Sequence, residues 1–185
     1  TFFKVVYRRH TNFAIESIEQ TFNGTANVNK TVNAVISRNG DLVAGMHVEF
    51  TLSDGTAEDL SGWGHKLIDE AEIEIGGQKI DKHYAQWLEI WSQLTGSSEK
   101  RKGYLEMAGK PNTSGARVPL QFWFNRNPGL ALPLIALQYH EVKINLDIRP
   151  IGECLWAVSS LNGTSTMSVT QAYQQSLVAA SLYID

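Results

Sequence analysis

The segment 117–149 constrains the fold more strongly than any other part of this chain. Its first part, VPLQFWF, is rich in β-branched and aromatic residues and predicts a buried strand. The next residues, NRNPG, end that strand, because Pro128 and Gly129 cannot continue a β-ladder. LALPLIALQ is apolar nearly all round and predicts a short buried helix or a turn of helix, which Pro133 limits in length. VKINLDI then alternates strictly between apolar and polar residues and predicts a half-buried strand.

Short strands separated by turns also dominate the rest of the sequence. Alternating or apolar runs predict strands at 12–22, 26–38, 42–52, 67–77, 153–160 and 176–185. Asn39-Gly40 predicts a hairpin turn, because both residues tolerate positive φ. No β-α-β rhythm is present, so we expect an all-β fold, an eight-stranded jelly-roll β-sandwich with two facing four-stranded sheets and short helices in the loops between strands.

The clearest predicted helix spans residues 83–95. Its apolar residues fall at helical spacing and form one stripe, made by Tyr84, Trp87, Leu88, Trp91 and Leu94. We therefore expect Trp87 and Trp91, together with Trp123 in the predicted strand VPLQFWF, to be core anchors. The segments 53–66 and 97–116 predict long surface loops. Trp63, in the first of these loops, is the tryptophan that could anchor a partner or a glycan instead.

Composition excludes several classes of protein. A chain of 185 residues with 43% hydrophobic and 19% charged residues predicts one folded domain. The net charge of −3 gives no global case for direct binding of nucleic acid, and the basic run at 99–103 predicts a solvated loop. The single cysteine, Cys154, excludes an internal disulfide and a four-cysteine zinc site. No apolar run is long enough to predict a transmembrane segment.

Motifs for catalysis and metal binding are missing from the sequence. The five histidines show none of the spacings typical of zinc ligands, and no nucleophile elbow, P-loop or dinucleotide fingerprint is present. Glu70, Glu72 and Glu74 lie on one face of a predicted strand, which is typical of a solvated strand face as well as of paired catalytic acids. We therefore expect no catalytic site, no cofactor and no metal. Four N-x-S/T sequons are candidate glycosylation sites, at Asn23, Asn29, Asn112 and Asn162.

Three long blocks resemble one protein family, in the order in which that family has them. They are TFFKVVYRRHTNFAIES at 1–17, IDEAEIEIGGQKIDKHYAQWLEIWSQL at 68–94 and PLQFWFNRNPGLALPLIALQYHEVKI at 119–144. The family is that of the major capsid proteins of large icosahedral double-stranded DNA viruses, the nucleocytoplasmic large DNA virus type. These proteins carry two jelly rolls in each chain. The resemblance implies that residues 1–185 are the N-terminal jelly roll and that a second jelly roll follows residue 185.

The resemblance also implies a structural, non-enzymatic function. The family assembles into homotrimers that form pseudo-hexameric capsomers and tile the icosahedral shell. The implied partners are further copies of the chain, neighbouring capsomers and minor capsid proteins, and the implied location is the virion, with assembly in the cytoplasm of the host cell. The predicted loops at 53–66 and 97–116 are the candidates for outer-surface or intersubunit contacts.

Two alternatives remain open from the sequence. One is a carbohydrate-binding, lectin-like jelly roll that uses Trp63 and loop acids, and the other is a glycoside hydrolase with two facing carboxylates. The sequence starts inside an apolar run and stops within the predicted strand at 176–185. We expect a fragment in which that strand is buried on both faces, so that an apolar flank and a sheet edge are exposed at its end.

Overall fold

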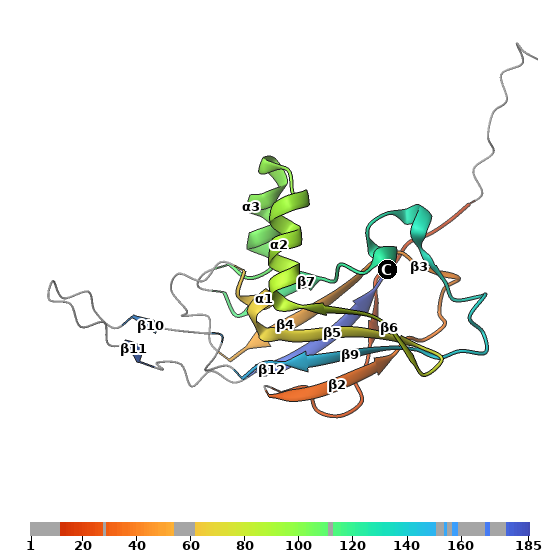
Figure 1. The fold of residues 1–185 in the computed structure, drawn as a ribbon, viewed down its shortest axis with the longest axis horizontal. Coiled ribbons are helices and arrows are strands. Elements are labelled where there is room, and N and C mark those ends of the chain that lie inside the picture. The colour runs from red at the N-terminus through yellow and green to blue at the C-terminus, as the bar shows by residue number, and fades with distance from the viewer. Residues whose placement is uncertain are drawn as a thin grey trace, which may run out of the picture.

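Two four-stranded antiparallel sheets form a sandwich in the computed structural model (Figure 1). The structure describes residues 12–27, 29–53, 62–110, 113–150, 154, 157–158, 169–170 and 177–185. In spatial order, the first sheet consists of β1 (Ile18–Gln20), β12 (Leu177–Ile184), β4 (Met46–Leu52) and β7 (Gly115–Pro119). The second sheet consists of β2 (Lys30–Val35), β9 (Val142–Ile148), β5 (Ile68–Ile75) and β6 (Gln78–Tyr84).

The strand order is that of a jelly roll. When these eight strands are numbered along the chain, the first sheet has the order first, eighth, third, sixth, and the second sheet has the order second, seventh, fourth, fifth. Every neighbouring pair is antiparallel. The chain therefore passes repeatedly from one sheet to the other, which gives a double Greek key. The predicted eight-stranded jelly-roll sandwich is confirmed.

The core lies between the two sheets and follows from alternation along the strands. In β9, residues Val142, Ile144, Leu146 and Ile148 are buried, while the residues between them are half-buried. β4 shows the same pattern from the opposite sheet, with four buried apolar residues from Met46 to Leu52. Because side chains alternate between the two faces of a strand, one apolar face from each sheet meets the other in a single cluster. The strand predicted at 142–148 is confirmed.

Short elements fill the connections between these strands. The helices are α1 (Trp63–Leu67), α2 (Ala85–Thr95) and α3 (Ser98–Met107), with 3₁₀ turns η1 (Trp123–Asn125) and η2 (Pro128–Leu130). β3 (Leu42–Val43) pairs with β8 (Leu132–Pro133), and β10 (Ala157–Val158) pairs with β11 (Val169–Thr170). Figure 1 shows α2 and α3 rising side by side out of the sandwich, and we call these two helices the helical projection. No helix in the described part of the chain has the length and apolar character to cross a membrane.

The helix predicted at 83–95 begins two residues late, because a hairpin turn at Gly76-Gly77 leads into a strand, β6, that extends to Tyr84. Both glycines have positive φ, +59° and +81°, which suits the two-residue turn that joins β5 to β6. β6 then runs through His83 and Tyr84, and α2 begins at Ala85. β6 is not predicted by the sequence pattern, because QKIDKHY lacks a continuous apolar face.

Three predictions about connections are wrong. Asn39-Gly40 does not form a hairpin, because neither residue has positive φ and the flanking strands, β2 and the short β3, belong to different sheets. LALPLIALQ is not a buried helix; it contains the end of η2, the short strand β8 and a series of turns. The segment 97–116 is not only a loop, because α3 occupies Ser98–Met107 and β7 begins at Gly115. The basic run at 99–103 therefore lies in an exposed helix.

Trp63 lies inside the protein, which corrects the prediction that it belongs to a surface loop. It begins α1, and its side chain is only 2% exposed. α1 packs closely on its neighbours, since a Cβ atom on Gly64 would lie 2.6 Å from both the Ala108 carbonyl oxygen and Val118 Cγ2. A Cβ atom on Gly109 would lie 2.6 Å from Trp63 Cδ1. These close contacts require glycine at both positions, and Gly109 packs directly against the indole ring.

The last strand also differs from its prediction. β12 is an inner strand of its sheet, with β1 paired on one side and β4 on the other, so it does not leave a sheet edge unpaired. Its inner face is buried through Leu177, Leu182 and Ile184, whereas Val178 is 63% exposed, so the described residues leave its outer face uncovered. Burial of that outer face against a second jelly roll stays a prediction.

Candidate functional site

The acidic face of β5 is tied to the neighbouring strands. Glu72 forms an ion pair with Lys79 at 3.0 Å and accepts a hydrogen bond from Asn145 Nδ2 at 3.0 Å, and Glu70 pairs with Lys82. Burial would raise the pKa of Glu72, but the hydrogen bonds from Lys79 and Asn145, together with the positive charges of Lys79 and Lys82, lower it below its usual value. Glu70 and Glu72 are thus compensated by lysines. This arrangement differs from the facing carboxylates that a glycoside hydrolase requires.

The remaining candidate kinds of site are a metal site and a lectin-like site. Across the described segments, no group of three or more His, Cys, Asp or Glu side chains is placed to hold a metal ion. Cys154 is buried, and its Sγ donates to the carbonyl oxygens of Lys66 and Pro150 at 3.1 and 3.4 Å. Trp63 cannot serve a lectin-like site, because its ring is enclosed in the core.

Two of the four predicted glycosylation sites lie in described segments. Asn23 is exposed, but its Nδ2 donates to Asn33 Oδ1 at 2.8 Å. Asn29 is exposed and has a left-handed φ of 58° just before β2. Asn112 and Asn162 lie outside the described residues. Glycosylation at these four asparagines stays a prediction.

The predicted core anchors lie at the border of the core. Trp87, Trp91 and Trp123 are each half-buried, and only Trp123 packs against the core cluster. The buried residues of α2 are Ala85 and Leu88 in its first half, because the rest of the helix projects away from the sandwich. Trp87 and Trp91 therefore lie outside the core cluster and form a tilted pair, with ring centroids 5.4 Å apart.

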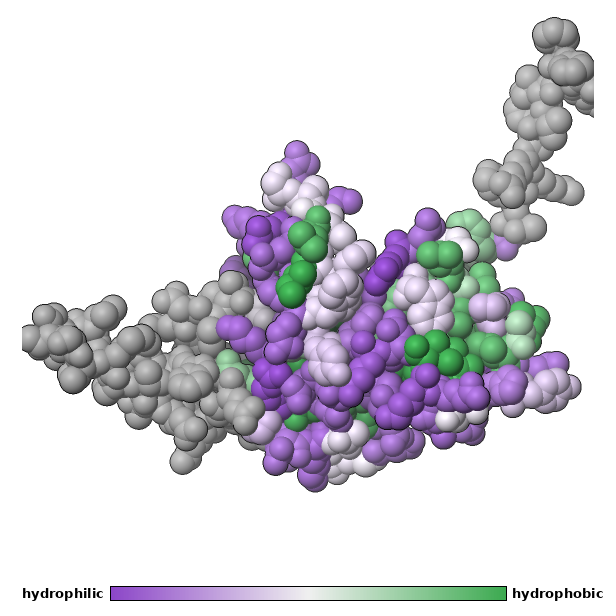
Figure 2. Space-filling model, viewed as in Figure 1, coloured by the Kyte–Doolittle hydropathy of each residue, from purple (hydrophilic) through white to green (hydrophobic). Residues whose placement is uncertain are grey.

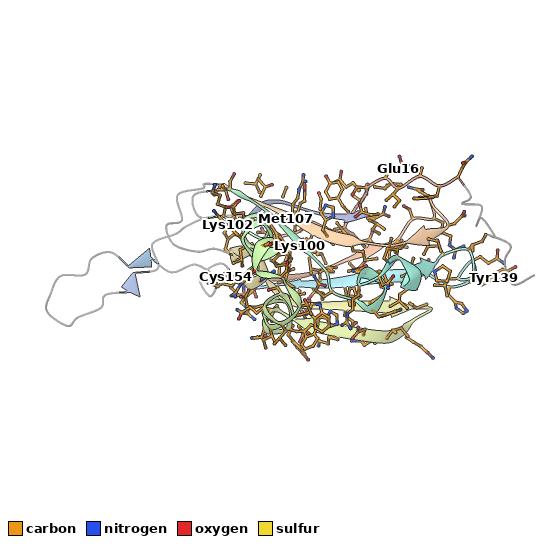
Figure 3. All side chains as sticks on the ribbon, turned by 90° about the horizontal axis from the view of Figure 1, so that it is seen from above. Glu16, Lys100, Lys102, Met107, Tyr139 and Cys154 are labelled. Atoms are coloured by element: carbon orange, nitrogen blue, oxygen red, sulfur yellow. The ribbon has the colours of Figure 1, made fainter. Side chains whose placement is uncertain are left out.

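The two ends of the sandwich are built differently. The long connections between β4 and β5, β6 and β7, and β9 and β12 all leave from the end at which the helical projection stands. The opposite end has the Gly76-Gly77 hairpin, the 36–45 connection and the 120–141 connection. Figure 3 shows Lys100, Lys102 and Met107 of α3 at the first end and Tyr139 at the second.

An exposed apolar surface covers part of the second end, where Figure 2 shows hydrophobic residues gathered. We call it the apolar corner and define it by Leu42, Leu130, Pro133, Ile135 and Tyr139. Ile135 is 68% exposed and Tyr139 is 89% exposed. Large side chains of this kind are normally covered in a folded protein, and an exposed group of them marks a surface that contacts another protein.

Local geometry explains why these residues face outward. In the β3–β8 pair, Val43 lies opposite Leu132 and both are buried, so alternation turns their neighbours Leu42 and Pro133 toward solvent. The turns that follow are held in place from two sides. Leu134 N donates to the Asp41 carbonyl oxygen at 2.9 Å, and Arg38 Nη2 donates to the carbonyl oxygens of Leu137 and His140 at 2.8 and 3.1 Å.

Sequence patterns do not predict the apolar corner. LALPLIALQ has the composition of a buried segment, and only its turns and the two-residue strand β8 divide it into buried and exposed positions. Tyr139 and its neighbour His140 are both exposed. The corner is therefore suited to contact with an apolar protein surface.

Comparison with known proteins identifies a family. The family model "Major capsid protein N-terminus" matches residues 1–185. The major capsid protein of Phaeocystis pouchetii virus is 51% identical over 100% of this chain and 44% of its own length. The major capsid protein of Paramecium bursaria Chlorella virus 1 is 50% identical over 78% of this chain and 35% of its own length. The chain thus spans less than half the length of these two relatives.

Solved structures agree with these sequence matches. A quasi-atomic model of the Paramecium bursaria Chlorella virus 1 capsid matches with a TM-score of 0.79 and 41% identity, over 100% of this chain and 44% of that chain. The Faustovirus major capsid protein matches with a TM-score of 0.62 over 97% of this chain and 55% of that chain. At 15% identity, the second likeness supports the fold alone.

Proposed function

This chain belongs to the family of viral major capsid proteins, whose N-terminal region it matches along its whole length, and we propose that it helps to build the icosahedral shell of a large double-stranded DNA virus. Its role in that shell is structural and not enzymatic. The two viral relatives described above are major capsid proteins. In addition, Glu70 and Glu72 of β5 are held by lysines and an asparagine. The proposed location is the virion, with assembly in the cytoplasm of the host cell.

The observation that carries this proposal is the apolar corner. Ile135 and Tyr139 are highly exposed in the isolated sandwich. Covering them with another surface would stabilise the assembly by about 25 cal/mol for each Å² of apolar area removed from water. A shell protein must form repeated contacts of this kind with its own copies. The corner offers a fixed surface for them, since Arg38 and Asp41 hold its turns in place.

The proposed assembly unit is a homotrimer. This chain aligns with 44% of the Phaeocystis pouchetii virus protein, so that relative has room for a second domain. We propose that in the present protein, too, a second jelly roll follows residue 185. Three polypeptides with two sandwiches each give a pseudo-hexameric capsomer. Neighbouring capsomers and minor capsid proteins are its further proposed partners.

The lectin-like alternative is not adopted, because Trp63, its proposed aromatic, is enclosed in the core. Light scattering coupled to size exclusion tests the choice on the full-length polypeptide. We expect a stable particle with the mass of three polypeptides. A single-polypeptide mass at every concentration tested would contradict the proposed capsomer and would favour a monomeric binding module or enzyme.

A further inference from the structure

The helical projection is attached to the sandwich by few buried contacts. α3 has no buried residue, and α2 has only Ala85 and Leu88. Yet two histidines of the described structure are buried, His65 and His83, and both lie at the base of this projection. His65 belongs to α1, and His83 lies two residues before α2. A buried histidine is the side chain best suited to make such an attachment depend on pH.

His83 is packed as a neutral ring. Its imidazole stacks on Phe122 with a centroid distance of 4.8 Å and lies 6.3 Å from the ring of Trp87. Its Nε2 lies 3.1 Å from Asp81 Oδ2, which places the single proton of the neutral ring on Nε2. Its Nδ1 is buried and has no hydrogen-bond partner among the described side chains and backbone. A proton added at Nδ1 would therefore meet no acceptor from the protein.

The charged groups around His83 oppose each other. Burial lowers the pKa of His83 most, Arg126 lowers it further, and Asp81 partly offsets both. The guanidinium of Arg126 lies 4.3 Å from the ring centroid of Trp91. Trp91 is paired with Trp87, whose ring lies beside His83. The carboxylate of α2, Glu89, is directed elsewhere, toward His65 and Gln93. On β6, Lys82 alternates to the opposite face, where it pairs with Glu70.

His65 has the opposite character. Its Nδ1 lies 2.9 Å from Glu89 Oε2 in α2, and its Nε2 lies 2.9 Å from Tyr104 Oη in α3. Burial raises the pKa of Tyr104 to about 12, so the phenol keeps its proton and its oxygen can still accept a hydrogen bond. Both ring nitrogens of His65 thus have hydrogen-bond partners, one in α2 and one in α3. His65 therefore joins α1 to both helices of the projection.

We propose that His83 is an acid-sensitive latch: protonation of its ring loosens the junction of β6 and α2 from the sandwich, while His65 keeps the three helices joined to one another. The sign follows from linkage. A histidine with a lowered folded-state pKa stabilises the fold above its unfolded pKa, about 6.5, and that stabilisation is lost as the pH falls through the lowered folded value. The junction is therefore closed at neutral pH and opens in a mildly acidic medium.

Hydrogen exchange at the amides of residues 85–95 measures this opening in the full-length polypeptide, after correction for the intrinsic effect of pH on exchange. We expect several-fold faster opening in acid than at neutral pH in the wild type and in His140→Gln, a control at the far end of the sandwich. His83→Gln, which retains an N–H group for Asp81, should lose this acid response. Retention of the response in His83→Gln, or no response in the wild type, would overturn the proposal.

Two further variants keep the test decisive if His83→Gln does not fold. Asp81→Asn removes the group that raises the pKa of His83, so the midpoint of the acid response should move to lower pH. Arg126→Gln removes a group that lowers it, so the midpoint should move to higher pH. Equal midpoints, or shifts in the same direction, would exclude His83 as the latch. The exchange readout is local to α2 and does not depend on whether the polypeptide forms trimers.

Discussion

Replacing Trp63 with alanine should lower the free energy of unfolding by about 3–5 kcal/mol, as expected when a large aromatic is removed from a packed core. The indole is enclosed at the base of α1, beside Gly109 and close to the backbone turn at Ala108. These neighbours are held by backbone hydrogen bonds, including Gly64 N to the Ala108 carbonyl oxygen at 2.9 Å. They cannot collapse into the space that the ring leaves, so the cavity remains and adds to the loss.

Urea unfolding followed by circular dichroism measures this loss, and Phe13→Ala is the matched control. Phe13 is 81% exposed, so its removal should change the free energy of unfolding by less than about 0.5 kcal/mol. If Trp63→Ala unfolded at the wild-type urea concentration, α1 would not be packed as described. Trp63 would then regain its place as a candidate for binding a partner or a glycan.

Replacing Ile135 with aspartate should weaken or abolish assembly without unfolding the sandwich. Burial of an isoleucine side chain contributes about 1.5–3 kcal/mol, and an unpaired carboxylate in an interface costs more. Since about 1.4 kcal/mol corresponds to a tenfold change in affinity, each affected contact should weaken by at least about tenfold. The position is exposed in the isolated chain, so the fold itself loses little.

The matched control for this variant is Val178→Asp. Val178 is similarly exposed but lies on β12, away from the apolar corner. Light scattering should show a smaller species for Ile135→Asp and the wild-type species for Val178→Asp, with unchanged circular dichroism for both. The reverse result would move the contact surface from the corner to the face of the first sheet.

Strand periodicity made most of the sandwich predictable. The alternation of Val142, Ile144, Leu146 and Ile148 is a local property of the sequence, and burial on one face follows from it directly. The same reasoning failed where a partner strand was not yet known. Asn39-Gly40 has the chemistry of a hairpin turn, but its flanking strands enter different sheets, and only the complete topology decides this.

The candidate site was harder to predict than the fold. Trp63 stands in a Gly-rich stretch that suggests a loop, yet its ring packs against Gly109, which lies far away in the sequence. LALPLIALQ suggested burial, yet the pairing of Leu42 with Pro133 turns part of it outward. Neither of these long-range contacts can be predicted from composition or residue spacing. The resemblance to capsid proteins was visible in the sequence, but the position of the contact surface was not.

Hydroxyl-radical labelling of Tyr139 in assembled particles and in dissociated full-length polypeptide tests the proposed assembly surface most directly. Tyr139 is 89% exposed in the isolated chain, whereas Tyr84, at the junction of β6 and α2, supplies an internal reference outside the apolar corner. If the apolar corner is a contact surface of the shell, Tyr139 should be labelled readily in the dissociated polypeptide and protected after assembly, while Tyr84 keeps its reactivity. Equal labelling of Tyr139 in both states would contradict the proposal that this corner joins subunits.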